Sequence, residues 1–145
     1  MATVRQLLEQ RPGEVWTIDP DETVFNAIKL MSDKEIGSLL VMRGGRLIGI
    51  LSERDYTRKV ALMERSSKTT KVADIMTGKV ITVDPGAGVD DCMRLMSTHH
   101  IRHLPVIDET GRAVGVISIL DVLKSILSNK EFEIQQLENY IAGSA

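Results

Sequence analysis

A sequence repeat constrains the fold of this chain more than any other feature. Residues 49–55 read Gly-Ile-Leu-Ser-Glu-Arg-Asp, and residues 115–121 read Gly-Val-Ile-Ser-Ile-Leu-Asp. The similarity extends outward over residues 17–60 and 82–126, with one extra residue in the second copy. A copy of this length buries too little surface to be stable alone, so the two copies are expected to pack together. The chain is therefore predicted to form one unit with two similar halves.

Within each copy the hydrophobic period changes in the same order. Residues 24–31 carry apolar side chains at helical spacing, and residues 38–42 and 47–51 then flank a Gly-Gly turn, which is typical of a β-hairpin. The second copy repeats this order with a helix over 89–96 and a hairpin over 103–117. Each copy is thus predicted to run β-α-β-β-α, which places the chain in the α/β (α+β) class. A second helix closes each copy and carries the apolar residues Tyr56, Val60 and Met63 in the first half and Val122, Ile126 and Leu127 in the second.

The segment boundaries follow from composition. The polar stretch Glu64 to Lys71 is typical of a linker, and Ile134, Leu137 and Ile141 fall on one side of a predicted C-terminal helix, which is expected to dock on the domain or on a second subunit. The predicted segments are a lead-in helix (1–13), the first copy (14–64), the linker (65–71), the second copy (72–128) and the C-terminal helix (129–145).

Composition narrows the classes of function. The net charge of -2 gives no general attraction to nucleic acid, and no apolar run has the length of a membrane span or the pattern of a signal peptide. The cytoplasm is therefore the expected compartment, with no membrane and no nucleic acid as partner. Cys92 is the single cysteine and lies on an apolar helical face, so it is predicted to be a small core residue.

Neither a metal site nor a catalytic site is expected. His99 and His103 have a spacing that suits a metal on a helix, but the segment from Ile101 to Ile107 is predicted to be a strand that contains Pro105. No nucleophile has an adjacent base and an orienting acid in the sequence, so the chain is predicted not to be an enzyme.

The Ser-x-x-Asp turns that open the closing helices allow two interpretations. Ser52 with Asp55, and Ser118 with Asp121, have the spacing of capping boxes, in which the side chains satisfy the first backbone N–H groups of a helix. The same turns could hold a ligand, because one carboxylate oxygen can cap while the other faces a bound molecule. Both interpretations remain open from the residues alone.

The whole pattern resembles a pair of CBS motifs, named after cystathionine β-synthase. The resemblance rests on the Asp-Pro openings, on Ile-Arg-His-Leu-Pro-Val-Ile-Asp at 101–108 and on the two Gly-h-h-Ser-x-x-Asp closings, and it covers about residues 14–127. The run Ser52 to Val60 is similar to small stand-alone bacterial proteins with two such motifs. The resemblance implies a pseudo-twofold module that commonly forms a homodimer.

The resemblance also implies a function. Such modules are non-catalytic regulatory or signal-transduction units that bind an adenosyl ligand in clefts between the motifs and pass the change to an effector protein supplied in trans. AMP is the expected ligand, with ATP, ADP or NAD(H) as other candidates, and no metal is expected. The alternatives are a protein-interaction subunit with degenerate clefts and, less favoured, a small metal-binding protein or enzyme.

Carried over position by position, the family roles predict two unequal clefts. Asp55 would bind ribose hydroxyls, Ser52 would lie near the phosphate, and Thr77 and Val80 would meet the adenine. Arg102 and His103 are interpreted as charge-assisted phosphate contacts, unless they are a solvated charge and a core-edge histidine. In the second cleft Pro12 stands where a threonine is expected, beside Glu14. Arg54 is the strongest candidate among the cations of residues 54–59, most of which, including Lys59, are expected to be solvated. The candidate ligand-binding residues are Val15, Trp16, Ser38, Ser52, Arg54, Asp55, Arg58, Thr77, Lys79, Val80, Arg102, His103, Pro105, Ser118 and Asp121.

Overall fold

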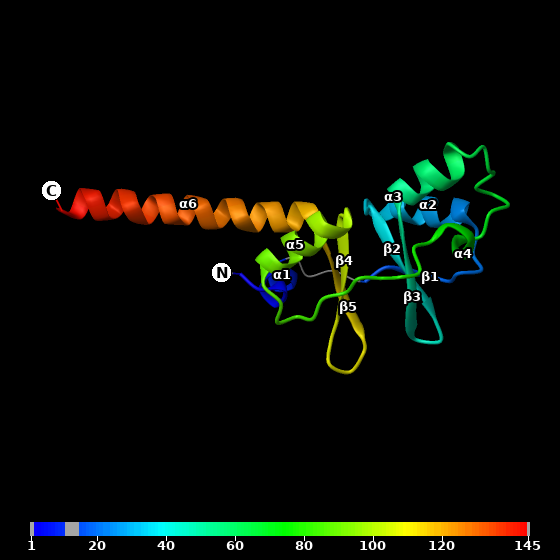
Figure 1. Ribbon diagram of the computed structural model, residues 1–145, viewed down its shortest axis with the longest axis horizontal. Coiled ribbons are helices and arrows are strands. Elements are labelled where there is room, and N and C mark those ends of the chain that lie inside the picture. Colours follow the sequence, from blue (N-terminus) through cyan, green and yellow to red (C-terminus); the bar gives the residue numbers. More distant parts are fainter. Residues whose placement is uncertain (1, 11–14, 145) are drawn as a thin grey trace.

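Two β-hairpins stand side by side at the centre of the molecule, one from each copy of the repeat (Figure 1). The computed structural model describes residues 2–10 and 15–144. In the first half, β2 (Ser38–Arg43) pairs antiparallel with β3 (Arg46–Ser52) and parallel with the short β1 (Thr17–Ile18). In the second half, β4 (His103–Ile107) pairs antiparallel with β5 (Ala113–Ser118). The hairpins lie where the sequence predicts them. The opening strand expected near Thr82 is reduced to one parallel bridge between Val83 and Val106.

Matching helices precede the two hairpins. α2 (Val24–Lys34) and α5 (Val89–His99) confirm the predicted amphipathic helices, and both end in a left-handed residue, Glu35 at φ 55° and His100 at φ 54°. The Thr23 hydroxyl caps α2 by accepting a hydrogen bond from the Asn26 N–H at 3.2 Å. Because the two helices end alike, both copies of the repeat turn into their hairpins in the same way.

The helices that close the two copies differ from one another. In the first half, α3 (Glu53–Tyr56) continues as a π-helical turn, η1 (Thr57–Ala61). Val60 is buried there, but Met63 is 67% exposed. The helix ends before residue 63, and the side chain therefore does not reach the core. In the second half the helix is α6 (Ile119–Ser144), in which Val122 is buried and Leu127 is exposed.

The two halves exchange their lead-in helices. The N–H of Val4 in α1 (Val4–Gln10) donates to the Ala87 carbonyl at 2.9 Å, in the second half. The N–H of Val72 in α4 (Val72–Ile75) donates to the Glu22 carbonyl at 2.9 Å, in the first half. Each half therefore depends on a helix that belongs to the other end of the chain, as a pseudo-twofold arrangement requires.

Each half has its own hydrophobic core. Cys92 is fully buried in the second core, as predicted, and burial raises the pKa of its thiol. The first core contains Ile18, Val24, Ala27, Met31, Leu39, Val41, Leu51, Val60, Val72 and Ile75. The second contains Val4, Leu7, Val83, Val89, Cys92, Met96, Leu104, Val106, Ile117 and Val122.

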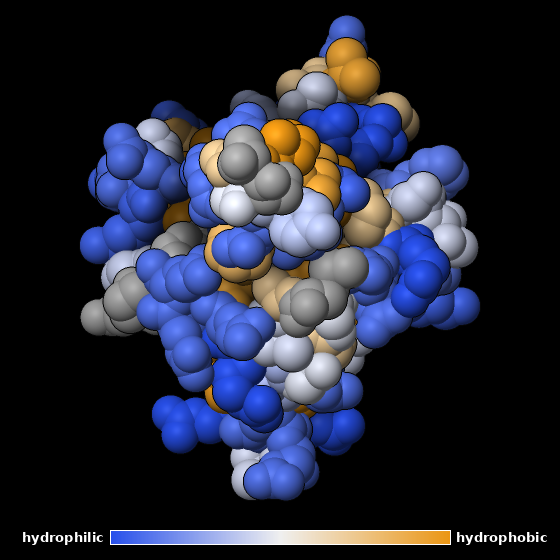
Figure 2. Space-filling view, turned by 90° about the vertical axis from the view of Figure 1, so that its left-hand side faces the viewer, coloured by the Kyte–Doolittle hydropathy of each residue, from blue (hydrophilic) through white to orange (hydrophobic). Residues whose placement is uncertain are grey.

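α6 is one continuous helix of 26 residues, where the sequence suggested a closing helix followed by a separate C-terminal helix. Its C-terminal half extends away from both hairpins (Figure 1). Ile134, Leu137 and Ile141 are 55%, 63% and 66% exposed, so the expected docking of this segment on its own domain is wrong. Viewed toward the end of the helix, hydrophobic side chains gather on one side of it (Figure 2). In the described part of the chain, no helix is both long and apolar enough for a membrane span.

Candidate ligand clefts between the two halves

Two clefts open where the halves meet, and both reach Gly37, Arg102 and His103. Cleft 1 lies beside the start of α3 and has a volume of about 450 Å³. Cleft 2 lies beside the start of α6 and has a volume of about 780 Å³. Both volumes fall within the usual range for small-molecule sites, about 300 to 1,000 Å³. The lining of cleft 1 is Gly37, Ile50, Ser52, Glu53, Arg54, Asp55, Arg58, Lys59, Thr77, Lys79, Val80, Ile81, His100, Ile101, Arg102, His103 and Pro105.

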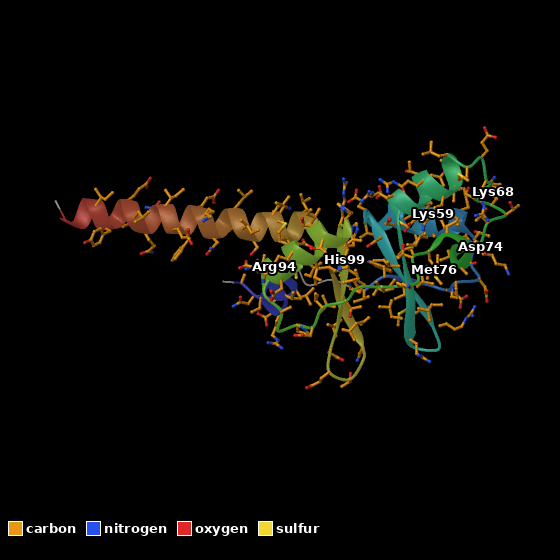
Figure 3. All side chains as sticks on the ribbon, in the orientation of Figure 1. Lys59, Lys68, Asp74, Met76, Arg94 and His99 are labelled. Atoms are coloured by element: carbon orange, nitrogen blue, oxygen red, sulfur yellow. The ribbon has the colours of Figure 1, made fainter. Side chains whose placement is uncertain are left out.

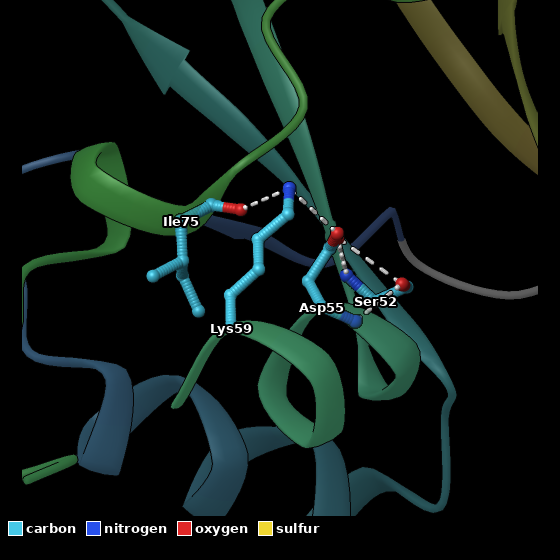
Figure 4. Close-up of polar contacts among 4 residues, drawn as sticks. All are labelled: Ser52, Asp55, Lys59 and Ile75. Carbon is cyan, nitrogen blue, oxygen red and sulfur yellow. Dashed lines mark hydrogen bonds and ion pairs between the residues drawn. The ribbon is translucent and has the colours of Figure 1, made fainter. Parts of the chain in front are cut away.

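Ser52 and Asp55 form a capping box at the start of α3 (Figure 4). The Asp55 Oδ2 atom accepts hydrogen bonds from the Ser52 N–H at 2.9 Å and from the Ser52 hydroxyl at 3.1 Å. The Ser52 Oγ atom in turn accepts one from the Asp55 N–H at 3.2 Å. The capping interpretation is therefore confirmed, and it uses one of the two carboxylate oxygens.

Lys59 holds the other oxygen of Asp55. Its Nζ atom lies 3.1 Å from Asp55 Oδ1 and donates a hydrogen bond to the Ile75 carbonyl at 3.0 Å (Figure 4). The expectation that Lys59 is merely solvated is wrong, because the i,i+4 spacing brings the ammonium to the carboxylate one helical turn earlier. Lys59 thus links the start of α3 to the end of α4.

Cleft 1 carries an excess of positive charge. Arg54, Arg58, Lys59, Lys79 and Arg102 line it, against the two carboxylates of Glu53 and Asp55. The Arg54 Nη1 atom donates to the His100 carbonyl at 3.3 Å, which ties α3 to the second half. In a recess with apolar walls, such a set of cations attracts an anion such as a phosphate.

An apolar strip completes cleft 1. The backbone of Thr77 pairs with that of Ile50 through two hydrogen bonds, N–H to O at 2.9 and 3.0 Å. This bridge fixes the segment that carries Val80 and Ile81 against the first half, and both residues line the cleft together with Pro105. The lining therefore combines apolar side chains with polar and cationic ones.

Cleft 2 repeats the capping box with a different charge balance. Asp121 Oδ2 accepts from the Ser118 N–H at 2.9 Å and from its hydroxyl at 3.0 Å. The two cations Arg102 and Lys124 face the two carboxylates Glu35 and Asp121. The remaining lining is Leu8, Val15, Trp16, Ile36, Gly37, Ser38, His103, Val114, Gly115, Val116, Ser118, Ile119 and Leu120.

In cleft 2, one face of the Trp16 indole ring is already in contact with another side chain. The Lys34 ammonium lies 4.4 Å from the centre of the indole ring, in cation–π contact. Pro12 and Glu14, which the sequence placed beside Trp16, lie outside the described residues.

His103 faces both clefts from the start of β4. Burial lowers its pKa from the ordinary value, the Arg102 charge lowers it further, and the Asp121 carboxylate acts in the opposite direction. This shift favours the neutral imidazole, and the phosphate contact expected of His103 stays a prediction. His103 is thus a hydrogen-bonding group that the two clefts share.

Gly37 provides the room that His103 needs. A Cβ atom at Gly37 would lie 3.3 Å from His103 Nε2, which is a tight contact, and 3.5 Å from Glu53 Oε1, which is an ordinary one, so a larger residue would crowd the imidazole. Sequence reasoning did not select Gly37. The available signal was that the repeat places it opposite the charged Arg102.

All fifteen residues predicted from the sequence line one of the two clefts. The structure adds Lys59, whose spacing from Asp55 could have revealed it, and Gly37. The three histidines do not converge on a metal: the described residues contain no group of three His, Cys, Asp or Glu side chains that could hold an ion.

Solved structures of similar proteins share this architecture. A CBS-domain protein of Burkholderia ambifaria superposes with a TM-score of 0.84 at 48% identity, over 88% of this chain and 95% of that chain. The CBS domain pair of protein MJ0100, in complex with 5′-methylthioadenosine and S-adenosyl-L-methionine, superposes with a TM-score of 0.78 over 89% of this chain and 98% of that chain. Its sequence identity of 24% shows the common fold alone.

Sequence comparison leads to the same family. The mitochondrial CBS domain-containing protein CBSX3 of Arabidopsis thaliana is 44% identical over 128 residues, which cover 85% of this chain and 62% of the plant protein. The chain thus spans less than two thirds of that relative. The CBS-domain profile matches residues 4–62 and 72–128, so that each match begins at one of the exchanged helices. The chain therefore belongs to the CBS-domain family and carries two CBS motifs in tandem.

Proposed function

We propose that the protein binds an adenosine nucleotide in cleft 1 and acts as a non-catalytic regulatory module. The observation that carries the proposal is the meeting of the Asp55 carboxylate, an apolar strip and five cationic side chains in one cleft of about 450 Å³. A carboxylate accepts hydrogen bonds from the two ribose hydroxyls, an apolar strip covers a base, and the cations offset the charge of a phosphate.

We place each part of the nucleotide beside the lining residues whose chemistry suits it. Val80 and Pro105 lie on the apolar side, where the adenine would bind next to the Thr77 hydroxyl. Ribose would reach Asp55 Oδ1, and the 5′-phosphate would approach Arg102 and Lys79. AMP is the first candidate. The further cations Arg54 and Arg58 would offset the additional phosphate charge of ADP, ATP or NAD(H).

Regulation is possible because both motifs line cleft 1. α3 belongs to the first motif and β4 to the second, and both contribute to cleft 1. A nucleotide that binds one arrangement of the motifs more tightly shifts the protein toward that arrangement by its difference in affinity. An effector protein in trans would respond to this shift. The MJ0100 structure supports the proposal only in that a CBS pair of this fold holds adenosyl compounds.

Isothermal titration of the purified protein with AMP, ADP, ATP, NADH and adenosine tests the proposal. Saturable binding of at least one nucleotide, weakened by added salt, is the expected result, since the phosphate contact is electrostatic. GMP serves as the matched control for the base. If none of the adenosyl compounds binds, the nucleotide-sensor function is wrong and the alternative, an interaction subunit with empty clefts, takes its place.

A further inference from the structure

A hydrogen bond from Arg54 joins the first motif to the second beside cleft 1. Its donor, Arg54 Nη1, lies in α3, and its acceptor is the His100 carbonyl at 3.3 Å, 46 residues further along the chain. His100 is the left-handed residue that ends α5. α5 runs toward the first half, and its last residue, His99, lies on the side of the second half that faces the first (Figure 3). We call this hydrogen bond the Arg54 clamp.

The clamp stabilises the end of α5 as well as the contact between the motifs. The last carbonyl groups of a helix have no N–H partner inside the helix, and they form the negative end of its dipole. A guanidinium group at this place offsets that negative charge. Loss of the clamp is therefore expected to loosen the last turn of α5.

The corresponding pair in cleft 2 cannot form a clamp. In the repeat, Arg54 corresponds to Leu120 and His100 to Glu35, which ends α2 in the same left-handed conformation. Both residues line cleft 2, but the leucine side chain has no N–H group to donate. The clamp is thus a feature of cleft 1 and not of the shared backbone frame.

A ligand in cleft 1 competes for the same guanidinium group. Arg54 and His100 both line the cleft, and the hydrogen bond between them is exposed. In the proposed orientation Arg102 and Lys79 approach the 5′-phosphate of AMP, which leaves Arg54 at the clamp. ATP carries two further phosphates. Their charge-assisted contacts with a guanidinium are stronger than one hydrogen bond of 3.3 Å to a neutral carbonyl.

We propose that AMP leaves the Arg54 clamp closed and that the longer phosphate chain of ATP opens it. This inference rests on the proposed function, because it assumes that the nucleotide binds in cleft 1. It adds that the number of phosphates, and not occupancy alone, determines how firmly the two motifs are held together. Two adenosine nucleotides in the same cleft then favour two different arrangements of the protein.

Titration calorimetry in magnesium-free buffer tests the competition. Arg54→Met removes all donors of the side chain and keeps most of its length. ATP is expected to bind about fivefold more weakly to this variant, the equivalent of one exposed ion pair, and the AMP affinity should stay within about twofold of wild type. The control is Arg58→Met, which removes the same charge from the same cleft, one helical turn further on, and leaves the clamp in place.

Hydrogen exchange over residues 97–101 tests the opening itself. In wild type, these amides should exchange faster at saturating ATP than at saturating AMP. In Arg54→Met they should exchange fast with either nucleotide, because there is no clamp to open. Arg58→Met should keep the difference between ATP and AMP. Melting curves check that both variants are folded.

The outcomes separate this inference from the proposed function. If wild type binds both nucleotides but residues 97–101 exchange equally with each, the clamp is not a switch, and the nucleotide-binding function stands. Equal losses of AMP and ATP affinity in Arg54→Met would also overturn the inference. If wild type binds neither nucleotide, the proposed function is wrong and the inference is refuted with it.

Discussion

The two clefts have the same backbone frame and different chemistry. Each has a capping box, Ser52 with Asp55 or Ser118 with Asp121, at the end of a hairpin. Three positions that follow in the repeat then diverge: Glu53, Arg54 and Lys59 in the first half correspond to Ile119, Leu120 and Ser125 in the second. The first half carries charged side chains at these three positions, whereas the second half carries none.

This difference shows how a duplicated unit can keep one backbone frame while its side chains diverge. The capping boxes preserve the fold in both halves, because each satisfies the first N–H groups of its helix. The side chains that point away from the caps are free to change. In our account cleft 1, which both halves line, binds the anionic ligand, whereas the closing helix of the second half extends as the exposed helix α6.

The largest expected difference between the two clefts is in the effect of replacing their aspartates on AMP affinity. Asp55→Ala removes the ribose contact and is expected to weaken AMP about ten- to 150-fold, since hydrogen bonds to a charged group contribute about 1.5 to 3 kcal/mol. Asp121→Ala, which loses the matching cap in cleft 2, should leave the AMP affinity within about twofold. Titration calorimetry measures the AMP affinity of both variants, and melting curves check that both are folded. Equal losses in the two would mean that the clefts are not different.

Removing Arg102 should separate the phosphate contact from the rest. Arg102→Ala is expected to weaken AMP and ATP about fivefold, because an exposed ion pair contributes up to about 1 kcal/mol. Adenosine, which has no phosphate, should bind as it does to the wild type. Lys124→Ala in cleft 2 is the matched loss of a cation. A similar loss for adenosine and AMP would assign Arg102 a structural role instead.

Lys59 should act as an internal competitor of the ribose. The Lys59→Met variant frees Asp55 Oδ1 while keeping the length of the side chain, and adenosine is expected to bind up to about fivefold more tightly, the equivalent of one partly exposed ion pair. AMP should gain less, because the same change removes one positive charge from cleft 1. Ser125→Ala at the corresponding position of α6 should change neither affinity. Weaker adenosine binding to Lys59→Met would show that Lys59 supports the site.

The smallest expected effect concerns His103, which the clefts share. Its pKa is lower in the folded protein than in the unfolded chain, so the unfolded chain takes up the proton first as the pH falls. The contribution of His103 to the free energy of unfolding is complete above about pH 6.5 and is lost below it. Urea unfolding at pH 7.5 and 5.5 should therefore show a greater loss of stability in wild type than in His103→Gln. An equal loss in both would contradict the pKa shift.

The sequence predicted local structure well, because local structure depends on residue period and turn chemistry. The helices around Val24 and Val89 and both hairpins lie where the spacing placed them. The repeat and the family resemblance together brought the fifteen candidate residues to the two clefts. The capping box of Ser52 and Asp55 could also be predicted, since it joins residues three apart in the sequence.

Contacts between distant segments could not be read in the same way. The exchange of α1 and α4 depends on packing between opposite ends of the chain, and no local pattern specifies it. The continuity of α6 was not predicted, although the run from Ser128 to Glu131 contains neither Gly nor Pro and therefore nothing that ends a helix. The space at Gly37 matters because His103, 66 residues further on, comes close to it.

The most direct measurement of the central claim is a crystal structure of the protein with saturating AMP. We expect one nucleotide per chain in cleft 1, with its ribose hydroxyls on Asp55, its adenine beside Thr77 and Val80, and Lys59 displaced from the carboxylate. AMP bound in cleft 2 with cleft 1 unchanged, or a cleft 1 that stays closed by the Asp55–Lys59 pair at saturating AMP, would contradict the account.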